Sequence, residues 1–134
     1  QGAGSRGKKH LSLVYFSSHS LVLLRRLTYI SAITIGEIAK GISKMTASKR
    51  KKSLTNWLNE TLPNRFEQRI LSIDFSTMVL WGNLVGQLEQ NGRPLPAMDS
   101  LIAAIALQNS LSLVTRNEND FAGTGVVIVN PWSI

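Results

Sequence analysis

The chain has 134 residues, no cysteine and a formal net charge of +7. This length fits one domain that buries most of its apolar surface without a disulfide or a structural metal. The lack of cysteine excludes a disulfide framework, a thiolate zinc site and a thiol nucleophile. No apolar run approaches the roughly 18 residues that span a bilayer, so we expect no membrane insertion and a cytoplasmic location.

The positive charge is concentrated in the first half of the chain. Thirteen of the fifteen Lys and Arg residues lie at or before Arg69, whereas residues 75–134 hold only Arg93 and Arg116. Lys and Arg gain affinity for phosphates by releasing condensed counterions, so this excess indicates a polyanionic partner. The alternative is that the basic run only solvates one face of a helix. The densest run consists of Lys49, Arg50, Lys51 and Lys52.

Residues 1–27 form a basic segment that we separate from a domain at residues 28–134. Its first nine residues are rich in glycine and basic side chains without periodicity, which predicts a mobile tail. Residues 7–26 faintly resemble a signal peptide. Polar residues at 17–20 interrupt their apolar core and no small-residue cleavage site follows, so we do not expect secretion.

From residue 27 onward, strand-like and helix-like stretches alternate. Apolar and β-branched residues predict a strand at 27–34, followed at once by a helix from Ile35. A second helix is predicted at 48–62, where Pro63 closes it. The remaining predicted elements are a strand at 69–74, a long helix ending near Asn91 and Gly92, a helix at 98–110, and strands at 111–115 and 126–130. This alternation predicts a three-layer α/β domain, with a mainly parallel sheet flanked by helices.

Several acidic or amide side chains follow a predicted strand or begin a predicted helix. They are Glu37, Asp99, Asn117 and Asp120. Ligands of parallel sheets gather outside the carboxyl ends of the strands, and clustered carboxylates suit Mg²⁺ or Mn²⁺. Such an ion orients water for hydrolysis of a phosphodiester. Each residue also has a structural explanation, because an acid in a first helical turn stabilises the helix and Asp120 fits a turn.

Four blocks of sequence resemble the PIN-domain toxins of the VapC type over about residues 29–132. They are SAITIGEIAKGI, RPLPAMDSLIAAIAL, LVTRNENDFAGTG and VNPW, which occur in the order and at the spacing typical of that family. The resemblance implies a PIN-like fold and a Mg²⁺- or Mn²⁺-dependent endoribonuclease. It also implies the toxin role in a type II toxin–antitoxin system, with a VapB-type antitoxin and a second copy of the chain as partners.

The resemblance assigns roles to individual residues of this chain. Glu37 matches the glutamate in the helix after the family's second strand, and Asp99 matches the aspartate of its D-x-x-I-A-A helix. Asn117 and Asp120 lie where the family supplies its last ligand, and the match leaves open which of the two approaches the metal. We therefore predict Glu37, Asp99 and Asp120 as metal ligands, with Asn117 added as a catalytic candidate. The predicted RNA contacts are Lys49, Arg50, Lys51, Lys52 and Arg116, while Thr115 shares the motif of Arg116 and contacts phosphate or water.

The chain departs from the family pattern at its beginning. Members of the family open with an apolar strand that runs into Asp-Thr-Asn, whereas this chain has no acidic residue before Glu37. Ser17, Ser18 and His19 stand near the expected position, but none supplies an anionic oxygen. A frameshift, a truncated reading frame or a fusion to foreign coding sequence would explain the difference, so the N-terminal strand is either missing or replaced.

Two further functional hypotheses follow from this departure and from the charge. One is a catalytically inactive PIN-domain remnant that binds antitoxin or RNA. The other is a basic RNA- or DNA-binding module, which is disfavoured because the chain has no RNP, KH or zinc signature and its aromatic residues are scattered.

Overall fold

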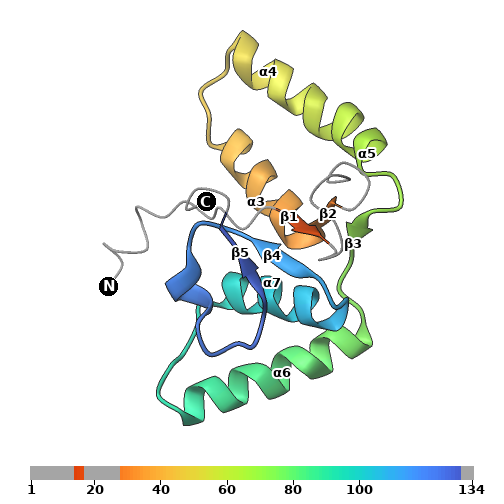
Figure 1. The fold of residues 1–134 in the computed structure, drawn as a ribbon. Helices are drawn as coiled ribbons and strands as arrows, with labels where there is room; N and C mark the ends of the chain where they lie inside the picture. The colour runs from red at the N-terminus through yellow and green to blue at the C-terminus, as the bar shows by residue number, and fades with distance from the viewer. Residues whose placement is uncertain (1–13, 17–27, 131–134) are drawn as a thin grey trace.

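The computed structural model describes residues 14–16 and 28–130. Its centre is a five-stranded sheet in the order β3-β2-β1-β4-β5 (Figure 1). Figure 1 shows α4 and α5 on one side of the molecule and α6 and α7 on the other. No helix among the described residues is long and apolar enough to cross a membrane. The strands are β1 (Val14–Phe16), β2 (Thr28–Ser31), β3 (Ile70–Leu71), β4 (Ser112–Val114) and β5 (Ile128–Val129).

The direction of β1 differs from that of every other strand. β2 is parallel to β3 and β4 is parallel to β5, whereas β1 is antiparallel to both β2 and β4. Phe16 pairs with Thr28 and Ser112, the first residues of β2 and β4, so β1 ends at the edge where its neighbours begin. The α/β fold with a mainly parallel sheet is confirmed, with a reversed strand in the central position. Ser17, Ser18 and His19 lie outside the described residues.

The first strand of the predicted domain is shorter than the sequence predicts, because β2 ends at Ser31 and helix α3 (Ala32–Ser43) begins directly after it. Ser31 is the N-cap: its extended backbone ends the strand, and its Oγ accepts a hydrogen bond of 3.0 Å from the Thr34 N–H. The predicted strand at 27–34 was therefore too long. The β-branched residues Ile33 and Thr34 suggested a strand, but the buried cap of Ser31 decides the local structure.

The second helical segment continues past Pro63, contrary to the sequence prediction. Helix α4 (Lys49–Asn56) passes through a π-helical turn, η1 (Trp57–Thr61), into α5 (Leu62–Arg65). In that turn the N–H of Leu62 bonds to the carbonyl of Trp57, five residues earlier. Pro63 then occupies the first turn of α5, where a missing backbone donor costs little.

Helices α6 (Phe75–Gln90) and α7 (Ala97–Gln108) pack against each other beside the sheet. Of the strand predicted at 69–74, only Ile70 and Leu71 form β3. Asp74, at the end of that range, instead caps α6 by accepting a hydrogen bond of 2.9 Å from the Thr77 N–H. The apolar face of α7 builds the core, as its spacing predicts. The core cluster consists of Ile102, Ala103, Ile105, Ala106, Leu113 and Phe121.

Candidate functional site

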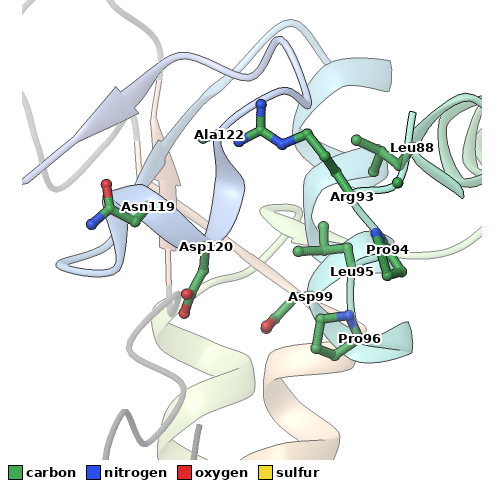
Figure 2. A pocket seen from close by; sticks show the side chains of 10 residues that line it. Leu88, Arg93, Pro94, Leu95, Pro96, Asp99, Asn119, Asp120 and Ala122 are labelled. Carbon is green, nitrogen blue, oxygen red and sulfur yellow. The ribbon is translucent and has the colours of Figure 1, made fainter. Parts of the chain in front are cut away.

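A cavity of about 490 Å³ opens between the end of α6, the start of α7 and the 3₁₀ helix η2 (Glu118–Phe121) (Figure 2). It lies where the loop after β4 approaches the first turn of α7. Three groups of residues line it: Leu88, Gly92, Arg93, Pro94, Leu95 and Pro96 from α6 and the connection to α7, Asp99 from α7, and Asn119, Asp120 and Ala122 from η2 and the residue after it.

Asp99 and Asp120 reach this cavity from two elements that are far apart in the sequence. Figure 2 shows their carboxylates pointing toward the same side of the cavity, and both residues are half-buried. Two carboxylates that face one space repel each other, so the pair favours a cation between or beside them.

The first turn of α7 holds Asp99 in place through its neighbour Ser100. The Ser100 side chain is fully buried; its Oγ accepts a hydrogen bond of 2.8 Å from Trp81 Nε1 of α6 and donates one of 2.8 Å to the Ala97 carbonyl. This bridge joins the two helices beside the cavity. The position of Asp99 therefore depends on the packing of α6 against α7.

The loop that carries Asp120 is fixed from both sides. Before it, the buried Thr115 Oγ1 accepts a hydrogen bond of 3.0 Å from the Asn117 N–H. After it, Phe121 is buried in the core, and its carbonyl accepts a hydrogen bond of 2.7 Å from Thr124 Oγ1. Asp120 is thus presented by a short helical turn with a buried anchor.

Glu37 lies in α3, which packs against α7, but it does not line the cavity. Its side chain is only 11% exposed, and its Oε2 lies 3.7 Å from the ammonium of Lys40. Within residues 14–16 and 28–130, no three acidic or histidine side chains are grouped closely enough to hold a metal ion. The structure therefore brings together Asp99 and Asp120, and the metal-ligand role of all three acids stays a prediction.

The remaining candidates of this loop take different positions. Asn117 precedes η2 and does not line the cavity, whereas Asn119 lines it with a side chain that points away from the two carboxylates (Figure 2). Glu118 turns to the other side, where its Oε2 accepts a hydrogen bond of 2.8 Å from Asn130 Nδ2. Sequence reasoning missed Asn119 and also Arg93, whose indication was its isolation as a basic residue in an acidic stretch.

The basic run of α4 is exposed at three of its four positions. Lys49, Arg50 and Lys52 are exposed, but Lys51 is half-buried, and its Nζ donates hydrogen bonds to the carbonyls of Ser43 (3.3 Å) and Met45 (3.0 Å). We predicted from the sequence that the whole run is exposed to solvent, and this is wrong for Lys51, which satisfies carbonyls at the end of α3. Arg116 is exposed, and the RNA-binding roles of the run and of Arg116 stay predictions.

The clearest electrostatic shift lies outside the cavity. The Thr77 hydroxyl and the Thr77 N–H both donate hydrogen bonds to the carboxylate of Asp74. These bonds, that of the hydroxyl most strongly, lower the pKa of the carboxyl below its ordinary value. Asp74 is the N-cap of α6, so this shift belongs to helix capping.

The sequence profile of the PIN domain matches residues 18–126. The chain belongs to the PIN-domain family. It is 35% identical over 104 residues to plasmid stability protein StbB of Pseudomonas syringae, which covers 78% of this chain and 75% of that protein. The toxin FitB of Neisseria gonorrhoeae is 32% identical over 78% of this chain and 75% of its own length. The VapC ribonuclease Y4jK of Sinorhizobium fredii is 31% identical over 78% of this chain and 74% of its own length. The family resemblance predicted from the sequence is thus confirmed.

Solved structures of this PIN-domain family agree with the fold. FitAcB from Neisseria gonorrhoeae superimposes with a TM-score of 0.75 at 31% identity and covers 79% of this chain and 76% of the matched one. DNA-bound VapBC from Salmonella typhimurium gives a TM-score of 0.69 at 28% identity, with coverage of 81% and 78%. VapBC proteins form a family of toxin–antitoxin systems, and FitB is a toxin.

Proposed function

We propose that this chain is the toxin component of a type II toxin–antitoxin system and that its cavity binds RNA for metal-dependent cleavage. The observation that carries the proposal is the pair Asp99 and Asp120, which face one cavity in a PIN domain. The names of its relatives, a toxin and a VapC ribonuclease, support the same role. A VapB-type antitoxin and a second copy of the chain are the protein partners we expect.

The chemistry of the two carboxylates fits a hydrated Mg²⁺ or Mn²⁺ ion. Mg²⁺ keeps several of its waters and is held in proteins by one or two carboxylates together with substrate phosphates. When bound, the ion supplies a polarised water and neutralises charge that develops on the phosphodiester. Asp99 and Asp120 would hold the ion and orient its waters, and Glu37 would add a third carboxylate from α3, the helix that packs against α7.

We propose that cleavage by this chain is weak, because one carboxylate of the family's set has no counterpart. No acidic residue precedes Glu37, and β1 runs against its neighbours. These observations also favour the second candidate function, a catalytically inactive remnant that binds antitoxin or RNA. The two functions differ in whether the unmodified chain cleaves RNA at all.

Cleavage of mixed tRNA and ribosomal RNA distinguishes them. The unmodified chain is incubated with RNA in Mg²⁺, in Mn²⁺ or in EDTA, beside Asp99→Asn, Asp120→Asn and the control Glu89→Gln. Glu89 is exposed in the last turn of α6, so Glu89→Gln removes one acidic charge without changing the cavity lining. We expect slow, EDTA-sensitive cleavage that both aspartate variants lose and the control keeps. Binding without any cleavage would assign the remnant function instead.

A further inference from the structure

Arg93 is the one basic side chain among the described residues that line the cavity. We infer that its guanidinium binds a phosphate of the RNA strand on the wall away from Asp99 and Asp120. This inference rests on the function proposed above, in which RNA is the ligand of the cavity. It adds a substrate-binding residue that the family match does not assign.

The backbone at Arg93 is fixed by the way α6 ends. Gly92 adopts a φ of +70°, its N–H bonds to the Glu89 carbonyl (3.1 Å), and the Arg93 N–H bonds to the Leu88 carbonyl (2.8 Å). This pattern is a Schellman motif, which turns the chain sharply after a helix. Pro94 and Pro96 then restrict the connection to α7. The side chain of Arg93 therefore starts from a well-defined point on the cavity rim.

The guanidinium of Arg93 lies next to Gly123. A Cβ atom at Gly123 would lie 3.6 Å from both Cζ and Nη1 of Arg93, which is an ordinary van der Waals distance. Gly123 also has a φ of +88°, which disfavours any other residue there. Figure 2 shows the guanidinium beside Ala122, while the two carboxylates point to the other side of the cavity.

The guanidinium is available to a ligand. Arg93 is exposed, and its side chain makes no ion pair or hydrogen bond with another residue in the described part of the chain, although two carboxylates line the same cavity. A planar guanidinium binds a phosphate through two parallel hydrogen bonds, which an ammonium cannot reproduce. A phosphodiester in this cavity would meet repulsion from the acids and attraction from Arg93. The strand is therefore expected to seat one phosphate on Arg93.

The test measures RNA binding apart from cleavage. A fluorescein-labelled single-stranded RNA is titrated with the full chain in EDTA at several salt concentrations, for the wild type, Arg93→Gln, Arg93→Lys and the control Arg65→Gln. Arg65 is an exposed arginine at the end of α5, which Figure 1 shows apart from the connection between α6 and α7. Circular dichroism checks that each variant is folded.

We expect Arg93→Gln to weaken binding by about tenfold at low salt, the effect of one charged hydrogen-bonded contact. The slope of log K against log salt should fall by about 0.7, the value for one phosphate on a single strand. Arg93→Lys should recover the slope but only part of the affinity, because the charge remains and the paired geometry is lost. Arg65→Gln should change neither quantity comparably.

Several results would overturn the inference. RNA binding by Arg93→Gln equal to wild type, an equal loss in Arg65→Gln, or no RNA binding by the wild type would each do so. If the wild type binds RNA through Arg93 but never cleaves it, the nuclease proposal fails and this inference stands. If the wild type cleaves RNA and Arg93→Gln cleaves it with the same KM, this inference fails alone. An effect of Arg93→Gln on antitoxin binding only would assign the residue to the protein partner.

Discussion

Replacing Ser31 by alanine tests whether a buried helix cap sets the start of α3. The Ser31 side chain is 0% exposed and its Oγ interacts with both the N–H and the Oγ1 of Thr34, each at 3.0 Å. Ser31→Ala removes both interactions and leaves a buried N–H that water cannot reach. Loss of an N-cap costs about 0.5–2 kcal/mol, and a buried donor without a partner costs about 1–3 kcal/mol. Because the two terms overlap, we expect a loss of about 2 kcal/mol in the free energy of unfolding.

The structure supplies a matched control at the next helix. Ser48 caps α4 in the same way, with its Oγ accepting from the Lys51 N–H at 3.1 Å, but Ser48 is exposed. Water replaces the lost hydrogen bond there, so Ser48→Ala should cost no more than about 1 kcal/mol. The difference between the two variants isolates the effect of burial.

Urea denaturation followed by circular dichroism at 222 nm measures both variants, with the free energy extrapolated linearly to water. In thermal unfolding, a loss of 2 kcal/mol in a domain of this size should lower the Tm of Ser31→Ala by about 6–10 °C. Equal losses for Ser31→Ala and Ser48→Ala would refute the reasoning, since burial would then contribute nothing to the cap.

Three further substitutions test separate contacts. Trp81→Phe keeps an aromatic ring but removes the hydrogen bond to Ser100, so it should lower the free energy of unfolding by about 1 kcal/mol in urea titrations, and an unchanged value would contradict the α6–α7 bridge. Lys51→Gln should destabilise the fold more than Lys52→Gln in thermal melts, because Lys51 bonds to backbone carbonyls and Lys52 is exposed. Hydrogen bonds lower the pKa of Asp74, so its stabilisation is present above the ordinary value of 3.8 and is lost as pH falls through the lowered one. Asp74→Asn, a cap that does not titrate, should remove that part of the acid dependence of stability, which urea midpoints measured from pH 2 to 6 would reveal.

The sequence predicted those parts of the fold that local patterns determine. Apolar residues at helical spacing identified Ile102 and Ile105 as core positions, and Gly92 marked the end of α6. The acids of the candidate site could be named because Asp99 begins a helix and Asp120 follows a strand. Their meeting at one cavity also followed from the expected sheet topology.

Other features depend on contacts that no local pattern encodes. A lysine in a charged run looks the same whether it is solvated or bonded to carbonyls, as Lys51 is. A proline in a helical pattern predicts the end of the helix. Here a π-helical turn precedes Pro63 and the helical segment continues past it. Arg93 reaches the cavity from the turn after α6, and its guanidinium lies next to Gly123.

The direction of β1 bears most directly on the proposed RNA cleavage. Side chains alternate between the two faces of the sheet in a parallel and in an antiparallel strand alike. The sequence of β1 therefore does not predict its direction relative to its neighbours. In the observed direction its carboxyl end lies beside Thr28 and Ser112, at the edge opposite the one where β2 leads into α3. A parallel strand in this central place would instead end between Ser31 and Val114, near the start of α3 and the loop that leads to Asp120.

We therefore predict that exchanging residues 1–27 for an apolar strand that ends in Asp-Thr-Asn raises RNA cleavage. The added aspartate would contribute a carboxylate at the edge that already carries Glu37 and Asp120, and it would improve both the affinity for the metal and the control of its geometry. Since even indirect partners of metal ligands change activity by roughly 10–100-fold, the gain should exceed about tenfold in Mg²⁺. It should vanish in EDTA and when Asp99→Asn is added to the exchanged chain. Equal, robust and EDTA-sensitive cleavage by the two N-terminal sequences would refute this prediction, because the reversed strand would then already permit a complete site.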